Sequence, residues 1–218
     1  MVRFLLSGLF GFVLAVVLVV ITALPVEAKL KELNLEDFIF LDTKYGRSII
    51  LLYPDKAPNH VARVRKLVRE GFYDGLKFHR VLHGFMAQTG DPRGDGTGGS
   101  QYPDLRAEIN GMPFNRGVIG AARAMNPHSA NSQFFICFQA AWHLNPEYTA
   151  WGKVVKGMEY IDKIKRGSEA NNGTVVDPDV IISMKVAADV PGDHRALLLP
   201  LMPGAEAQQR KKILPRIP

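Results

Sequence analysis

The stretch FHRVLHGFMAQTGD, residues 78–91, decides how this chain is interpreted. It is mostly apolar, yet Arg80 stands in its first half and Gln88 near its end. A charged group among Phe, Val, Leu and Met is costly to bury unless it has a partner. Residues 78–82 and 85–89 each favour a β-strand, with a glycine between them. An arginine in such a strand is either part of a surface ion pair or a functional group.

The residues on either side of that stretch indicate a sheet with few helices. Apolar segments of strand-like composition recur between turn residues, and two segments show the period of a helix. The expected strands are 37–43, 47–53, 78–82, 85–89, 117–122, 133–138, 150–155 and 180–186. The expected helices, each followed by a glycine that favours a helix end, are 59–70 and 158–166. This pattern favours a closed sheet over alternating βαβ units.

The bulk composition fits one globular domain with extensions. Hydrophobic residues make up 47% of the 218 residues and charged residues 22%, which suits an ordinary core. The net charge of +6 is mild, and the basic residues are scattered apart from 210–212, so we expect no nucleic-acid partner. The single cysteine, Cys137, excludes an internal disulfide and is expected to be buried in an apolar strand.

The N-terminal segment has the layout of a secretory signal. Arg3 precedes an apolar run over residues 4–21, and Val26 and Ala28 fit the −3 and −1 positions of a cleavage site. The alternative is an uncleaved anchor, because the run is about long enough to cross a bilayer. In both cases the rest of the chain lies outside the cytoplasm. We therefore expect a periplasmic protein, or one anchored in the inner membrane through residues 4–21 and facing the periplasm.

Composition divides the chain into four parts. Residues 1–28 are expected to be the signal or anchor, 29–36 a lead-in, and 37–188 the folded domain. Residues 189–218 form a C-terminal extension with five prolines and no clean period, so we expect it to be loosely held.

Three patterns suggest other chemistries but lack the context that these need. Residues 94–99 match G-x-G-x-x-G, yet no helical pattern follows, which favours a shaping loop over a dinucleotide site. His79 and His83 are four residues apart, which on a strand means about 13 Å, too far for one zinc ion. Residues 172–174 match a glycosylation sequon. We therefore expect no metal and no cofactor.

The remaining motifs resemble those of one family. They are GFYDGLKFHRVLHGFMAQTGD (71–91), GTGGS (96–100), NPHSANSQFFICF (126–138) and YTAWGKVVKGMEYIDKI (148–164). Over roughly residues 37–187 the chain resembles the cyclophilin-type peptidyl-prolyl cis-trans isomerases, in particular their bacterial, exported branch. The resemblance implies a mainly β fold, a closed eight-stranded antiparallel β-barrel capped by two α-helices. It also implies isomerisation of X–Pro bonds in proline-containing polypeptides, such as unfolded or nascent exported proteins.

The resemblance also assigns residues to a site. Arg80 matches the catalytic arginine of the family, and Gln88 matches the glutamine that holds this arginine. The residues implied in substrate binding are Phe85, Met86, Ala122, Arg123, Phe135, His143, Leu144 and Tyr148. Taken alone, Phe135 fits a core position equally well, and its neighbour Phe134 is expected to be core.

Two positions depart from the family. Many members have a tryptophan where His143 stands, whereas here Trp142 lies one residue earlier. Either the loop is shifted or the groove rim lacks the indole, which contributes to cyclosporin binding, so we expect cyclosporin to bind weakly. Many members have a histidine where Tyr148 stands; tyrosine keeps an aromatic face and a hydroxyl, so we expect catalysis to persist.

The residues suit a reaction without a covalent step. The X–Pro amide rotates over a barrier of about 18–20 kcal/mol because resonance must be lost. A fixed donor aimed at the proline nitrogen stabilises the twisted amide more than either planar form. Arg80 offers such a donor, since a guanidinium stays charged and is rigid. The alternative is a non-catalytic proline-peptide-binding chaperone, or holdase, that uses the same groove.

Overall fold

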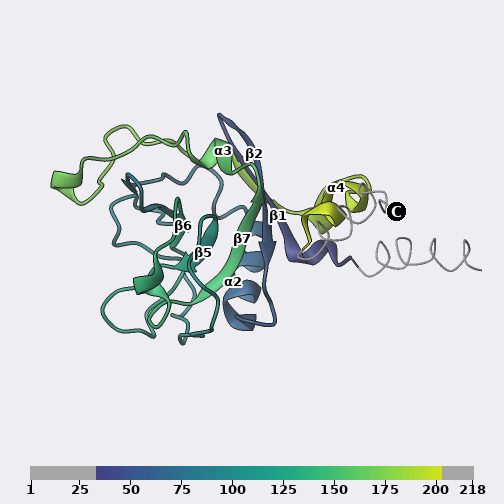
Figure 1. Ribbon diagram of the computed structural model, residues 1–218, viewed down its shortest axis with the longest axis horizontal. Coiled ribbons are helices and arrows are strands. Elements are labelled where there is room, and N and C mark those ends of the chain that lie inside the picture. The colour runs from purple at the N-terminus through teal and green to yellow at the C-terminus, as the bar shows by residue number, and fades with distance from the viewer. Residues whose placement is uncertain (1–32, 203–218) are drawn as a thin grey trace, which may run out of the picture. The chain divides into compact units, whose positions relative to one another are not determined.

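The computed structural model describes residues 33–202, and its compact unit, Leu35–Gly192, carries one eight-stranded sheet (Figure 1). The strands are β1 (Phe38–Thr43), β2 (Gly46–Leu52), β3 (Arg80–Leu82), β4 (Met86–Thr89), β5 (Val118–Ala121), β6 (Phe134–Cys137), β7 (Ala150–Lys156) and β8 (Ser183–Val186). The α-helices of this unit are α2 (Pro58–Arg69) and α3 (Met158–Ile161). Its short 3-10 helices are η1 (Leu35–Asp37), η2 (Trp142–Leu144), η3 (Glu169–Asn171) and η4 (Ala187–Asp189).

Between residue 193 and residue 202 lie a short α-helix, α4 (Arg195–Leu198), and η5 (Leu199–Leu201). Within residues 33–202 we find no helix that is long and apolar enough to cross a membrane. The signal or anchor expected at 1–28 and most of the extension beyond residue 202 lie outside the described residues.

All neighbouring strands are antiparallel, in the order β3-β4-β6-β5-β7-β2-β1-β8, so the mainly β antiparallel fold is confirmed. The expected closed barrel is not formed as a continuous ladder, because β3 and β8 are the two ends of the sheet. The segments that precede them meet through the bridge Lys77–Val180 and three backbone hydrogen bonds. These run from Gly75 N to Ile181 O at 2.7 Å, from Phe78 N to Asp179 O at 2.8 Å and from Ile181 N to Leu76 O at 2.9 Å.

The interruption at this seam also shortens two strands. β3 begins at Arg80 instead of residue 78, and β8 begins at Ser183 instead of residue 180. Pro178 has no N–H to donate to a ladder, and Asp177 before it has a positive φ of 52°. The pairing of residues 75–78 with 179–181 therefore does not continue along β3 as a regular ladder.

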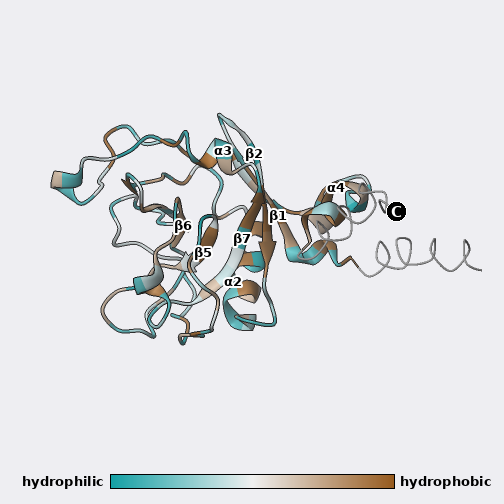
Figure 2. Cartoon of the chain, viewed as in Figure 1, coloured by the Kyte–Doolittle hydropathy of each residue, from teal (hydrophilic) through white to brown (hydrophobic). Residues whose placement is uncertain are grey.

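The core is built from the strands, on which Figure 2 shows the hydrophobic residues concentrated. Phe134 is 1% exposed and lies at its centre, where its ring makes edge-to-face contacts with Trp151 and Tyr73 at centroid distances of 5.5 Å. The expected core position of Phe134 is thus confirmed. Phe135, the next residue, points to the opposite face of the strand and belongs to a second cluster.

Helix α2 agrees closely with the expected range 59–70. Pro58 occupies its first turn, and Val61, Val64 and Leu67 bury one face. Gly71, with φ of 69°, follows its end.

Helix α3 is much shorter than the expected 158–166. After Ile161 the backbone continues with i→i−3 hydrogen bonds, from Lys163 N to Tyr160 O and from Ile164 N to Ile161 O. Gly167 N then donates to Val81 O at 2.9 Å, which draws the chain away toward β3. Ile161 and Ile164 are both buried, so the apolar spacing that suggested a longer helix serves a tight turn instead.

Candidate active site

One groove of about 540 Å³ is lined by all ten residues that the sequence assigns to a site. The hairpin of β3 and β4 supplies Arg80, Phe85, Met86 and Gln88, and the other lining residues come from the end of β5, from β6 and from the segment around η2: Ala122, Arg123, Phe135, His143, Leu144 and Tyr148. Glu147, which the sequence did not suggest, completes the lining. Segments far apart in the chain thus meet at one surface.

The polar wall of the groove is organised around Arg80. This residue pairs with Gln88 across the β3–β4 ladder, and its Nη1 donates to Gln88 Oε1 at 3.2 Å. Its Nε and Nη2 donate to the backbone O and the side-chain Oδ1 of Asn172, at 3.0 and 2.9 Å. Among the described residues Arg80 forms no ion pair, so its positive charge is held by neutral amide oxygens. Burial lowers the pKa of Arg80, but a guanidinium stays protonated at any working pH.

A chain of amide groups continues behind Gln88. Gln88 Nε2 donates to Gln133 Oε1 at 2.9 Å, and Gln133 Nε2 donates to the carbonyls of Gly96 and Gly98 at 3.0 and 2.8 Å. The sequence did not single out Gln133, although it stands in the SQFF motif beside Phe135. The polar wall is therefore anchored in the glycine-rich loop.

This glycine-rich loop is itself folded around one buried carboxylate, that of Asp91. Its oxygens accept hydrogen bonds from the backbone N–H groups of Arg93, Asp95 and Gly96, at 2.8, 3.1 and 2.6 Å. Burial alone raises the pKa of Asp91, but these backbone donors outweigh it and hold the pKa below its usual value. The loop thus has a shaping role, as its sequence suggests.

The apolar part of the groove is a slot with an aromatic wall. Met86, Phe135 and Leu144 are only 1%, 5% and 7% exposed and belong to one buried cluster. The Phe135 ring meets the ring of Tyr148 edge-to-face, with centroids 5.7 Å apart and planes at 85°. Such a slot can take a compact apolar ring beside the Arg80 guanidinium.

Arg123 supports the wall of the groove with its side chain. Its guanidinium lies 4.4 Å over the Tyr148 ring and donates to the carbonyls of Ala124 and Glu147, at 2.9 and 3.2 Å. Nη2 also reaches the Glu147 carboxylate at 3.3 Å. The side chain thus ties the loop after β5 to the turn before β7.

His143 lies at the rim of the groove, at the position where many members of the resembled family have a tryptophan. His143 lines the groove, with its ring centroid 5.6 Å from that of Phe85. Trp142 does not line it; its side chain is 69% exposed and its Nε1 donates to Asn115 Oδ1 at 3.3 Å. The loop is therefore not shifted so as to bring the tryptophan into the groove.

The two histidines set aside in the sequence, and Cys137, do not line this groove. His79 is buried and His83 is exposed, and residues 33–202 contain no cluster of His, Cys, Asp and Glu that could hold a metal. Cys137 is buried, and burial raises the pKa of its thiol to about 12, as expected for a structural cysteine.

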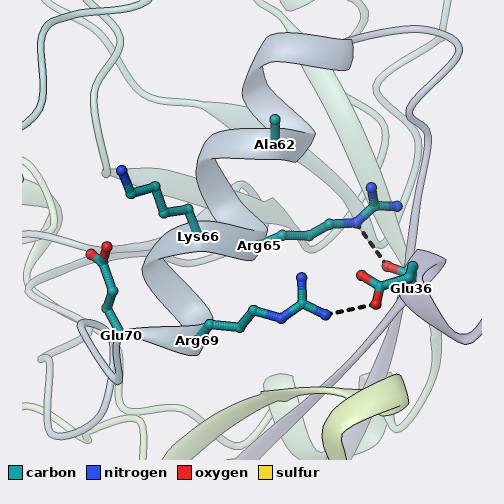
Figure 3. Close-up of a pocket in the computed structure, with 6 residues that line it drawn as sticks. All are labelled: Glu36, Ala62, Arg65, Lys66, Arg69 and Glu70. Carbon is teal, nitrogen blue, oxygen red and sulfur yellow. Dashed lines mark hydrogen bonds and ion pairs between the residues drawn. The ribbon is translucent and has the colours of Figure 1, made fainter.

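A second hollow, of about 520 Å³, lies on the outer face of α2 (Figure 3). Its arginines are paired: Arg65 Nε donates to Glu36 O at 2.8 Å, and Arg69 bonds to the carboxylates of Glu36 and Asp189 at 2.7 and 2.8 Å. Arg65 also pairs with Asp37. These contacts fasten η1 and η4 to the helix and leave little uncompensated positive charge.

Comparisons with known proteins agree with this fold. The model of the cyclophilin type peptidyl-prolyl cis-trans isomerases matches residues 38–186. A probable peptidyl-prolyl cis-trans isomerase of Brucella suis is 54% identical over 165 residues, which cover 71% of this chain and 84% of that protein. Peptidyl-prolyl cis-trans isomerase B of Bacillus subtilis is 44% identical over 118 residues, covering 53% of this chain and 81% of that protein.

Two solved structures show the same likeness. A cyclophilin from Hirschia baltica has a TM-score of 0.65 at 26% identity, covering 72% of this chain and 76% of that one. A cyclophilin type isomerase of Cryptosporidium parvum, solved in the presence of the dipeptide Ala-Pro, has a TM-score of 0.64 at 27% identity, covering 68% and 98%.

The antiparallel β fold, the family model and these relatives thus define the class of the protein, the prolyl isomerases. The chain belongs to the cyclophilin-type peptidyl-prolyl cis-trans isomerases. It is an enzyme that isomerises X–Pro bonds, and proline-containing peptides are its substrates.

Proposed function

We propose that the groove accelerates X–Pro rotation by seating the proline ring in the apolar slot and presenting the Arg80 guanidinium to the proline nitrogen. The observation that carries this proposal is the position of Arg80. It lies beside Met86 and Phe135 in one groove and is fixed there by neutral hydrogen-bond acceptors. The positive charge of Arg80 is therefore not neutralised by these acceptors and can act on a substrate bound in the groove.

The rate gain comes from the difference between the planar and the twisted amide. In the planar forms the nitrogen lone pair is delocalised and accepts hydrogen bonds poorly, whereas in the twisted form it becomes an acceptor. A donor fixed in advance stabilises only the twisted form and needs no reorganisation during the reaction. Each 1.36 kcal/mol of this preference is worth about tenfold in rate. Gln88 holds Arg80 and is placed to bond the substrate backbone.

The test is isomerisation of an X–Pro peptide by the purified protein, followed by NMR exchange. Arg80→Ala should lower kcat/KM about 100-fold, as expected for the loss of a fixed donor in a transition state. Arg106→Ala, which removes an exposed arginine that does not line the groove, should match wild type. An Arg80→Ala variant as fast as wild type contradicts the mechanism. A wild-type protein that binds the peptide without accelerating its isomerisation is a holdase instead.

The enzyme acts outside the cytoplasm, on exported polypeptides that are still folding. This part of the proposal rests on the N-terminal sequence, in which Arg3, the apolar run 4–21 and Ala28 have the order of an export signal. Cell fractionation and N-terminal sequencing of the mature protein test it. A mature chain that starts at Lys29 in the periplasm supports a cleaved signal, and an intact chain in the inner membrane supports the anchor. An intact chain in the cytoplasm refutes export.

A further inference from the structure

Asn172 contacts Arg80 with both of its oxygens, although 92 positions separate the two residues in the chain. Nε reaches the backbone O at 3.0 Å and Nη2 reaches Oδ1 at 2.9 Å. Gln88 engages Nη1 from the other side at 3.2 Å. All three guanidinium nitrogens are thus bonded, and three acceptors distributed over two residues define the plane of the group.

We propose that Asn172 is a positioning residue that holds the Arg80 guanidinium in the orientation it needs to meet the proline nitrogen. The inference rests on the proposed role of Arg80. A donor is effective only when its direction is set before the reaction begins. Asn172 does this without cancelling the charge of Arg80, because amide oxygens are neutral. A carboxylate in the same place would bind the guanidinium more strongly and compete with the substrate for it.

The backbone of Asn172 explains how both of its oxygens face Arg80. Its φ of 52° and ψ of 34° place it in the left-handed region, which disfavours most side chains but which asparagine tolerates. A glycine would fit this backbone with less strain. Glycine, however, lacks the side-chain amide whose Oδ1 accepts a hydrogen bond from Arg80 Nη2. Asparagine at this position therefore adds that hydrogen bond.

The segment that carries Asn172 is fastened to the strand that carries Arg80. Val81 N donates to Gly173 O at 2.8 Å, and Gly167 N donates to Val81 O at 2.9 Å. The contact is close, since a Cβ on Gly173 would lie 2.7 Å from Leu82 Cγ. Figure 1 shows this segment running out between α3 and β8 and back. Its contacts with β3 fix the distance between Asn172 and Arg80.

The test compares Asn172→Gly with Asp177→Gly. Asn172 and Asp177 are the two non-glycine residues with positive φ in the described part of the chain, both at 52°, so glycine relieves the same backbone strain at each. We expect Asn172→Gly to lower kcat about tenfold, the size of one lost hydrogen bond to a charged group, with KM unchanged. Asp177→Gly should stay within about twofold of wild type, since it removes no contact with Arg80. Neither variant should lower the thermal midpoint of unfolding.

A double-mutant cycle shows whether Asn172 acts through Arg80. In an Arg80→Ala background, Asn172→Gly should have no further effect on kcat. In protein with ¹⁵N-labelled arginine, rotation about the Cζ–Nε bond of Arg80 should become faster in Asn172→Gly and stay slow in Asp177→Gly.

Three results overturn the proposal: a wild-type kcat in Asn172→Gly, a rise in KM alone, or an equal loss with and without Arg80. If Arg80→Ala is slow while Asn172→Gly matches wild type, the role of Asn172 fails and that of Arg80 stands. If Arg80→Ala itself matches wild type, both roles fail.

Discussion

Phe135 lies against Phe114 with ring centroids 5.7 Å apart and planes at 28°, and the backbone of Gly120 supports both rings. A Cβ at position 120 would lie 2.4 Å from Phe135 Cζ and 2.7 Å from Phe114 Cε1. The slot therefore keeps its shape only because residue 120 has no side chain.

Gly120→Ala should displace the Phe135 ring and narrow or distort the slot. We expect KM for an X–Pro peptide to rise several-fold, and the free energy of unfolding to fall by about 1–3 kcal/mol, the usual cost of overpacking. Peptide kinetics and urea unfolding measure the two effects. Gly111→Ala is the matched control, because nothing lies within 4 Å of a Cβ there. Wild-type kinetics in Gly120→Ala would show that the slot does not depend on this packing.

The stability of the fold should fall on acidification because of one carboxylate at the start of α2. Glu108 Oε1 accepts from Asn59 N at 3.0 Å, and Oε2 accepts from His60 N at 3.0 Å and His60 Nδ1 at 2.6 Å. Burial raises the pKa of Glu108, but the hydrogen bonds from His60 and Asn59 outweigh it and lower the pKa below 4.5. Burial lowers the pKa of His60 below 6.5, more than Glu108 raises it, so the imidazole stays neutral.

Both groups therefore bind protons more readily in the unfolded chain. The free energy of unfolding should be highest above pH 6.5, decline as the pH falls because of His60, and decline further below pH 4.5 because of Glu108. Urea unfolding at several pH values measures this. At neutral pH, Glu108→Gln should lower the free energy of unfolding by about 0.5–2 kcal/mol relative to wild type, as the loss of other helix caps does. Between neutral pH and pH 4, the free energy of unfolding should then fall less in this variant than in wild type. Parallel profiles for the two proteins would exclude Glu108 as the cause.

Cyclosporin should bind weakly, because His143 and not an indole stands at the groove rim beside Phe85. His143→Trp should strengthen binding about tenfold, since a larger ring buries more apolar area. Titration calorimetry measures both affinities. Trp142→Phe serves as the control and should leave the affinity unchanged, because Trp142 does not line the groove. A nanomolar complex with the wild-type protein would refute this expectation.

Cys137 should be inert toward thiol reagents while the protein is folded. Its side chain is 0% exposed, and burial raises the pKa of the thiol to about 12, so almost no thiolate forms at neutral pH. Reaction with a disulfide reagent should be slow in buffer and fast in concentrated urea. Rapid labelling of the folded protein would mean that the cluster behind Phe135 opens easily.

The residues assigned from contiguous motifs line one groove in the structure. Arg80 and Gln88 are only eight residues apart, and a hairpin brings such neighbours into register whatever the rest of the fold does. Asn172 could not be found in this way. It reaches Arg80 from a loop that has no periodicity, and the pattern that drew attention to it, a sequon, points to a different chemistry.

The prediction of helices and strands from the sequence has the same limit: it misses what depends on contacts between remote residues. Apolar periodicity predicted both ends of α2 to within one residue, because the buried residues of this twelve-residue helix recur along one face. In the segment expected as the second helix, Ile161 and Ile164 are buried too, but burial alone does not distinguish a helix from a tight turn. The early end of α3 depends on the contact of Gly167 with Val81, which is remote in sequence. The lack of a continuous ladder between β3 and β8 likewise depends on backbone pairing between residues that are far apart in the sequence.

The hydrogen-bonded amides that run from Arg80 through Gln88 and Gln133 to Gly96 and Gly98 give the enzyme a means of adjustment away from its substrate. The loop around Asp91 has exposed residues at the surface, and the carbonyls of Gly96 and Gly98 hold the far end of this series. A change in the loop that moves these carbonyls would therefore be passed on to Gln88 and Arg80, although it lies outside the groove.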